Sequence, residues 1–348
     1  MKKLGFLNKV VFFLNTVFAV LLLLSYVLPY VFPKQFPLIS VLSLTVPVFI
    51  IVNAVFMLYW LIQLKRQFML SLIILIIGYK YVGAMYRISG ESESREEGVR
   101  LMTYNVRIFN AYGWLEGNIP EKITELVERE DPDVLCVQEF YHKQEDAFNK
   151  NYPHQFIKYT TLNNRTGQAI FSKYPIVERG SLEFPKTGNN ALYADIVKGK
   201  DTIRIYNLHL ESLHIVPSKE HISVENPEVL YKRMGKAFAL QHRQVEIFDE
   251  HRQKCRHKMI VAGDFNNTPY SYVYRQIKGD MKDSFIEMGS GFGRSYDFDY
   301  FPMRIDFILT DPEMEVMAHK NYSERLSDHY PVMATIRLGQ AAPEEKEK

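Results

Sequence analysis

The sequence predicts transmembrane α-helices followed by a larger α/β domain. The first 87 residues are dominated by leucine, valine, isoleucine and phenylalanine and carry few charges, whereas the rest of the chain has an ordinary globular composition. In that second part, short apolar runs typical of buried strands alternate with stretches typical of helices. We therefore expect two unlike parts, with the boundary between residues 87 and 99.

Three apolar stretches in the first part, at residues 10–31, 38–62 and 68–85, have the composition of membrane spans. A helix needs about 20 residues to cross a hydrocarbon core about 30 Å thick, so the first two are long enough. The third is marginal, and Lys80 near its end would have to reach toward the lipid headgroups. A signal peptide explains the first stretch less well, because Pro29 and Pro33 follow it in place of a cleavage site. Such continuous apolarity also argues against helices buried in a large soluble core.

Basic residues in the short loops predict the orientation of these spans. Five of them lie before the first span or between the second and third, namely Lys2, Lys3, Lys9, Lys65 and Arg66. Only Lys34 lies between the first and second spans. This bias favours a cytoplasmic N-terminus. With three spans the second part of the chain lies outside the cytoplasm, and with two it lies inside.

Several segments of the second part have the periodicity of regular structure. Residues 99–105 predict a strand, and residues 120–129 predict a helix because three aliphatic side chains fall on one face. Residues 156–159 and 168–171 have the pattern of hairpin partners. Residues 230–255 predict a long, basic, amphipathic helix.

Polar side chains follow the apolar runs of the second part where strands are expected to end. Five segments do so: Thr103-Tyr104-Asn105, Val137-Gln138-Glu139, Asn207-Leu208-His209, Gly263-Asp264-Phe265-Asn266 and Ser327-Asp328-His329. Further strands are predicted at residues 134–137, 203–206, 259–262 and 304–309. Strand ends packed side by side would bring these distant residues to one rim.

The residue types at these strand ends suit metal-assisted hydrolysis of a phosphate ester. That reaction needs a divalent cation to neutralise phosphate charge, an anionic residue to polarise the attacking water, and polar or cationic groups around the transition-state oxygens. Carboxylates, amides and imidazoles supply all three. The sequence therefore predicts a phosphoesterase site.

The five segments, in this order, resemble those of the endonuclease/exonuclease/phosphatase superfamily, which includes deoxyribonucleases, apurinic endonucleases and neutral sphingomyelinases. The resemblance covers residues 99–338 and suggests a membrane-anchored member of bacterial type. It implies a four-layer sandwich, in which two mixed β-sheets are flanked by helices. Residues 1–87 would form the anchor, 88–98 a linker, 99–338 the catalytic domain and 339–348 a charged tail.

The resemblance also implies the ligands of a cation. Glu139 would be the main ligand of Mg²⁺, with Mn²⁺ as an alternative, because hard cations prefer oxygen ligands. Asn105 would add a neutral oxygen, and Asp328 could help to hold metal or water. Glu139 as a solvated acid and Asn105 as a turn-forming residue are the alternative readings, and the number of ions stays open.

Catalytic roles follow from the same resemblance. Asp264 would orient or deprotonate the attacking water, and Asn266 would hold a phosphate oxygen, although both also suit an Asx turn. His329 would contact the scissile phosphate, with Asp306 accepting a hydrogen bond from its ring and raising its pKa. His209 would be a second phosphate-contacting histidine, unless it is structural.

Arg165 would contact substrate from a loop. The remaining histidines match no motif and are expected on the surface: His142, His154, His214, His221, His242, His251, His257 and His319.

Taken together, these features predict a membrane-anchored, Mg²⁺-dependent phosphodiesterase at the cell membrane, with a multi-pass anchor and no obligate protein partner. Its substrate would be extracytoplasmic nucleic acid or a phospholipid or sphingolipid headgroup. An inositol-polyphosphate phosphatase is disfavoured, because Asn267-Thr268-Pro269 and Arg304-Ile305-Asp306 depart from the pattern of that subfamily. A net charge of +2 argues against a protein built around a strongly basic nucleic-acid surface. A binding module without activity fits less well, since all the motif residues are present.

Overall fold

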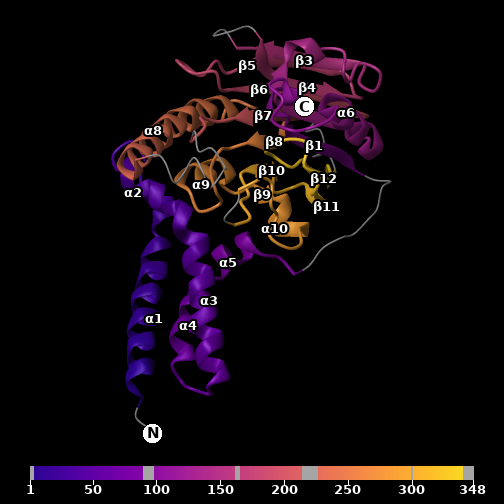
Figure 1. The fold of residues 1–348 in the computed structure, drawn as a ribbon. Helices are drawn as coiled ribbons and strands as arrows, with labels where there is room; N and C mark the ends of the chain where they lie inside the picture. Colours follow the sequence, from indigo (N-terminus) through magenta and orange to yellow (C-terminus); the bar gives the residue numbers. More distant parts are fainter. Residues whose placement is uncertain (1–3, 89–97, 161–164, 214–225, 299–300, 340–348) are drawn as a thin grey trace, which may run out of the picture.

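The structure is a computed structural model of the 348-residue chain and describes residues 4–88, 98–160, 165–213, 226–298 and 301–339. Most of the expected linker at 88–98 and almost all of the expected tail at 339–348 lie outside the described residues, as do His214 and His221. Figure 1 shows a helical bundle at one end and a larger α/β domain at the other.

The helical bundle contains α1 Phe6–Ser25, α2 Pro37–Val41, α3 Val46–Ile62, α4 Phe68–Ile77 and α5 Tyr79–Met85, with 3₁₀ turns at Leu28–Tyr30 and Leu42–Thr45. Two helical segments, Phe6–Tyr30 and Pro37–Ile62, are long and apolar enough to cross a membrane. The expected third stretch is not one straight helix, because α4 and α5 meet at 82°. A side chain at Gly78, where they meet, would collide with the Tyr26 ring, whose hydroxyl donates to Ile74 O at 3.0 Å.

A buried polar network joins the three apolar helices α1, α3 and α4. Asn15 Nδ2 donates to Ser71 Oγ at 2.6 Å, and Trp60 Nε1 donates to Asn15 Oδ1 at 3.0 Å. Ser71 Oγ in turn donates to Asn53 Oδ1 at 3.2 Å. Polar groups surrounded by apolar helices hold them together because no water competes for these hydrogen bonds. The short helix α4 is therefore packed as a full member of the bundle.

Two six-stranded mixed sheets form the centre of the α/β domain. One has the order β11-β12-β1-β2-β4-β3 and the other β5-β6-β7-β8-β10-β9. The first comprises β1 Val99–Asn105, β2 Val134–Tyr141, β3 His154–Tyr159, β4 Thr166–Ser172, β11 Glu315–Asn321 and β12 Val332–Arg337. The second comprises β5 Ile176–Ser181, β6 Asn190–Lys198, β7 Asp201–His209, β8 Lys258–Asp264, β9 Lys282–Asp283 and β10 Asp306–Thr310.

The helices of this domain are α6 Ile119–Glu130, α8 Pro227–Arg252, α9 Tyr272–Lys278 and α10 Ser284–Met288, with 3₁₀ turns at Arg107–Asn110 and His142–Gln144.

Alternation along each strand sorts its side chains between two layers. In β1, Leu101 packs against the second sheet while Met102 packs under α6. In β8, Val261 packs under α8 and α9. The expected four-layer sandwich is thus confirmed.

Most expected elements are present with shifted ends. The residues 156–159 and 168–171 pair antiparallel as β3 and β4. The long helix begins at Pro227 rather than at residue 230, because the Asn226 side chain accepts a hydrogen bond from the backbone N–H of Glu228 and caps it.

The expectation that His242 and His319 lie on the surface is wrong. Both are buried, and Ser284 Oγ lies 2.9 Å from His319 Nδ1.

The helical bundle packs directly on the α/β domain. Tyr231 Oη of α8 donates to Leu38 O of α2 at 2.6 Å, and the Arg275 guanidinium of α9 stacks on the Tyr30 ring, 4.2 Å from its centroid. Figure 1 shows the N-terminus at the far end of α1 from this junction. The chain therefore runs along the length of the bundle before it reaches the domain.

Candidate active site

The polar ends of four strands meet at one rim of the sandwich. β1 and β2 run parallel in one sheet, and β7 and β8 run parallel in the other. Asn105, His209 and Asp264 are the last residues of β1, β7 and β8, and Glu139 lies near the end of β2. Asn105 Nδ2 donates to Asp264 Oδ2 at 3.0 Å, which joins the two sheets at this rim.

The backbone of this rim is locally unusual. Glu139 has a φ of 51° and lies where the register between β2 and β4 shifts, and Asn266 has a φ of 49°. Gly263 has a φ of 137°, and a Cβ there would lie 1.9 Å from Leu208 O, so only glycine lets β7 and β8 approach. Left-handed backbone at residues other than glycine costs about 1–3 kcal/mol and clusters at functional sites.

Asp264 is the most connected carboxylate of the rim. Besides the bond from Asn105, it accepts from the backbone N–H of Asn266 at 2.7 Å and from Asn266 Nδ2 at 3.1 Å. Burial raises the pKa of Asp264 to about 7, and the nearby charge of Asp306 acts in the same direction. A carboxyl group with this pKa can accept a proton near neutral pH.

His329 and Asp306 form a buried pair. His329 Nδ1 lies 2.9 Å from Asp306 Oδ2, which is the contact expected from the sequence, and His329 Nε2 lies 3.7 Å from Asp264 Oδ2. Burial alone would lower the pKa of His329. The charges of Asp306 and Asp264 and the hydrogen bond to Asp306 outweigh burial and raise this pKa to about 10. His329 is therefore an imidazolium at neutral pH.

His209 lies on the other side of Asp264, with Nε2 3.7 Å from Asp264 Oδ2. Burial and the positive charge of His329 lower the pKa of His209 to about 3. The two histidines at this rim therefore differ in charge. His329 can stabilise negative charge, whereas His209 can act only as a neutral hydrogen-bonding group.

Asn266 is held within the protein through its side-chain amide group. Its Nδ2 donates to Leu210 O at 2.9 Å as well as to Asp264, so both amide hydrogens are used within the protein. These bonds help to fix the Asp264 carboxylate, and the expected contact of Asn266 with a phosphate oxygen stays a prediction. Arg165, expected to contact substrate, is exposed just before β4, beside the end of β2, and its carbonyl accepts the His142 N–H at 2.9 Å.

Arg107 is a charged residue of the rim that the sequence reading missed. Its Nε lies 3.3 Å from Asp328 Oδ2, and its guanidinium stacks 4.1 Å from the centre of the Trp114 ring. Its backbone N–H donates to Asn105 Oδ1 at 3.1 Å. An arginine two residues after the first motif was the available signal. Tyr296 was also missed, and its ring centre lies 4.9 Å from that of His329.

The side chains of this rim fit a divalent cation. Glu139 is partly buried, Asn105 Nδ2 lies 3.4 Å from its Oε1, and burial together with the charge of Asp328 raises its pKa. Within the described parts of the chain, four carboxyl groups of the rim, those of Glu139, Asp264, Asp306 and Asp328, lie beside two cationic side chains, Arg107 and His329. A divalent cation would favour the ionised forms of these carboxyl groups and offset their excess negative charge.

The position of such a cation can be narrowed by chemistry. Asp264, Asp306 and His329 offer ligand atoms within 4.8 Å of one another. In that set, His329 Nδ1 already lies 2.9 Å from Asp306 Oδ2, so one of the two ring nitrogens is engaged by a carboxylate. Glu139, with Asn105 and Asp328 nearby, supplies the oxygen ligands that Mg²⁺ and Mn²⁺ prefer.

Two family models match the chain, one for each part. Residues 8–85 match a domain of unknown function (DUF8431), and residues 102–329 match the endonuclease/exonuclease/phosphatase family. The chain belongs to the endonuclease/exonuclease/phosphatase family. It is accordingly a hydrolase of phosphate esters. Comparison with curated proteins gives no significant match.

Solved structures of low identity share the fold of this family member. An endonuclease/exonuclease/phosphatase from Beutenbergia cavernae DSM 12333 aligns with a TM-score of 0.52 at 18% identity, over 70% of this chain and 72% of that one. The human nocturnin catalytic domain with bound sulfate aligns with a TM-score of 0.52 at 16% identity, over 69% of this chain and 94% of that one. A mannosyl-6-phosphatase from Bacteroides thetaiotaomicron VPI-5482 aligns with a TM-score of 0.51 at 19% identity, over 68% of this chain and 99% of that one.

Proposed function

We propose that this chain is a membrane-anchored phosphodiesterase that depends on a divalent cation, Mg²⁺ or alternatively Mn²⁺. The observation that carries the proposal is the meeting of three groups at one rim: the carboxylate of Asp264, the Asp306–His329 pair, and the partly buried Glu139. They supply a proton acceptor, a fixed positive charge and an oxygen ligand, which together suffice for hydrolysis of a phosphate ester by water.

The side chains divide the reaction between them. Asp264 accepts a proton from the attacking water, and Asn105 and Asn266 fix its orientation through their hydrogen bonds. His329 donates a hydrogen bond from Nε2 to the phosphate, or a proton to the leaving oxygen, while Asp306 keeps its ring charged. A divalent cation held by Glu139 would neutralise phosphate charge.

Glu139→Gln tests the assignment of the cation ligand. The amide keeps the shape of the side chain but removes the charge that attracts a cation, so we expect a loss of roughly 10-fold or more at low Mg²⁺ and partial recovery at high Mg²⁺. Hydrolysis should be measured across a Mg²⁺ titration, with the exposed Glu125→Gln as control. A variant that matches the wild type at low Mg²⁺ would show that Glu139 is not the ligand.

An apolar pocket beside the site favours one class of substrate. A cavity of about 140 Å³ is lined by Asn266 of the rim, by Phe298 and Met303, and by Leu44 of the helical bundle. An apolar group attached to the phosphate would fit such a wall, which favours a phospholipid or sphingolipid over nucleic acid. The full chain in detergent should be assayed with DNA, RNA, sphingomyelin and phosphoinositides. Faster hydrolysis of a nucleic acid than of any lipid would reverse this preference.

The helical bundle supports anchoring with the domain outside the cytoplasm. The N-terminus and the α/β domain lie at opposite ends of the bundle (Figure 1), and Lys65 and Arg66 follow α3 at its distal end. Basic residues mark the cytoplasmic side. We expect a reporter that works only outside the cytoplasm to be active when it is fused after Lys348. Activity of a cytoplasm-only reporter at that position would contradict this orientation.

A further inference from the structure

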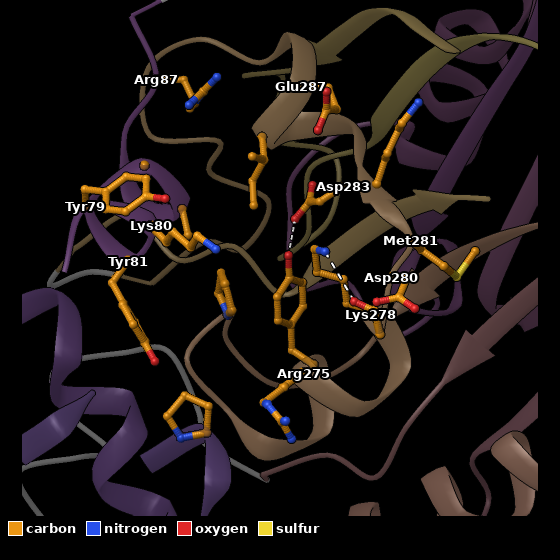
Figure 2. Close-up of a pocket in the computed structure, with 18 of the residues that line it drawn as sticks. Tyr79, Lys80, Tyr81, Arg87, Arg275, Lys278, Asp280, Met281, Asp283 and Glu287 are labelled. Carbon is orange, nitrogen blue, oxygen red and sulfur yellow. Dashed lines mark hydrogen bonds between the residues drawn. The ribbon is translucent and has the colours of Figure 1, made fainter. Parts of the chain in front are cut away.

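A second pocket lies at the junction of the helical bundle and the α/β domain, away from the rim of Asp264. Its volume is about 610 Å³, within the range of about 300–1,000 Å³ that is usual for ligand pockets. It lies between α5 and the 3₁₀ turn at Leu28–Tyr30 on one side and α9, β9 and α10 on the other. Figure 2 shows Tyr79, Lys80 and Tyr81 on one side, facing Lys278 and Asp283 across it.

The pocket lies at the depth where lipid headgroups would be found. It opens where the apolar helices α1 and α4 end, and α5 turns away from α4 by 82° there. Tyr30 and Tyr79 line it and expose 54% and 65% of their surfaces. Exposed tyrosines at the ends of apolar helices are typical of the membrane–water interface.

The lining carries an excess of positive charge. Its basic residues are Lys80, Arg87, Arg275, Lys278 and Lys282, and its acidic residues are Asp280, Asp283 and Glu287. The charge of Asp283 is compensated inside the domain, because Arg304 Nη1 lies 2.7 Å from its Oδ2 and Tyr274 Oη donates to the same oxygen at 2.6 Å. Five cations therefore face two uncompensated carboxylates.

Several of these cations have no acidic partner. Across the described parts of the chain, no carboxylate forms an ion pair with Lys80, Arg87 or Lys278, and Arg87 Nε is buried without a hydrogen-bond acceptor. A buried donor without an acceptor costs free energy, which an anionic ligand would recover. Basic pockets beside membrane helices suit phosphate-bearing headgroups.

We propose that this pocket binds the phosphate of an anionic membrane lipid, so that the headgroup lies between α5 and α9. The inference rests on the membrane anchor of the proposed function but not on catalysis. It assigns the pocket a ligand whose phosphate faces Lys80, Arg87 and Lys278 and whose acyl chains extend along the apolar helices. Bound lipid would then hold the bundle and the domain together at the bilayer surface.

Native mass spectrometry of the full chain in detergent tests this assignment, with phosphatidylglycerol as the titrated lipid. We expect one tightly bound phosphatidylglycerol, and a loss of roughly tenfold or more in affinity in the double variant Lys80→Gln/Lys278→Gln. The matched control is Lys65→Gln/Arg66→Gln, which removes two cations at the opposite end of the bundle and should leave this binding unchanged. Size-exclusion profiles and thermal unfolding of each variant show whether it is folded.

Four results would overturn the proposal. Equal affinity of wild type and the Lys80→Gln/Lys278→Gln variant would place the lipid elsewhere. An equal loss in the Lys65→Gln/Arg66→Gln control would indicate general attraction to basic surfaces. Displacement of the lipid by millimolar inorganic phosphate or glycerol 3-phosphate would identify a soluble phosphate as the ligand. Equal affinity of the full chain for phosphatidylglycerol and phosphatidylcholine would also contradict this inference. That result would leave the proposed hydrolysis intact.

Discussion

Replacing Asp264 by asparagine should reduce hydrolysis by roughly 10³–10⁴-fold, because the amide cannot accept the proton of the attacking water. In the wild type, Asn105 Nδ2 and Asn266 Nδ2 donate hydrogen bonds to the Asp264 carboxylate and orient it. The amide of the variant keeps one oxygen that can accept such bonds but has no second carboxylate oxygen. The turnover number should therefore fall with little change in KM. It should be measured with a water-soluble phosphodiester at saturating Mg²⁺.

Thermal unfolding of the same variant separates lost chemistry from a lost fold. Burial raises the pKa of Asp264 to about 7, so without a cation the ionised carboxylate destabilises the folded state. The unfolded chain, with a pKa near 3.9, loses this proton first, and stability falls as the pH rises from about 4 to about 7. In EDTA, Asp264→Asn should remove this part of the pH dependence. A variant that unfolds at a much lower temperature than wild type at pH 8 would contradict the assignment.

Much of this rim could be predicted because strand ends leave a clear pattern in the sequence. Val134–Tyr141 is an apolar run with Glu139 near its end, Lys258–Asp264 is one that ends in Asp264, and parallel pairing within each sheet puts strand ends together. The pairing of His329 with Asp306 could not be derived from periodicity and came from the resemblance to the family. Contacts between the two sheets depend on how the sheets face each other, which no local pattern encodes.

The features that were missed depend on tertiary packing. Arg107 lies beside Asp328 where four successive residues, 107–110, adopt left-handed backbone, and the sequence shows the position of the arginine after the first motif but not this backbone conformation. The bend at Gly78 is set by the Tyr26 ring, which lies about 50 residues earlier in the chain. His319 is buried against Ser284 of α10, which lies 35 residues earlier in the chain, whereas its own strand supplies Asn321 Oδ1, 3.0 Å from its Nε2.

His329→Ala should lower the rate roughly 100-fold or more, since removal of one charged transition-state donor typically costs that much. Asp306→Asn removes the charge that favours the imidazolium, so the pKa of His329 should fall from about 10. Activity needs the protonated ring and is lost as the pH rises through this pKa. The basic limb of the pH–rate profile should therefore move to lower pH in Asp306→Asn.

The double variant decides whether Asp306 acts through His329. His329 Nδ1 is 2.9 Å from Asp306 Oδ2, and Asp306 Oδ1 has no hydrogen-bond partner in the described part of the chain. If the carboxylate works only by keeping the ring charged and oriented, its removal should cost little once the ring is gone. Asp306→Asn/His329→Ala should then hydrolyse substrate about as fast as His329→Ala alone. Losses that multiply in full would mean that the two residues act independently, with Asp306 free to serve the cation instead.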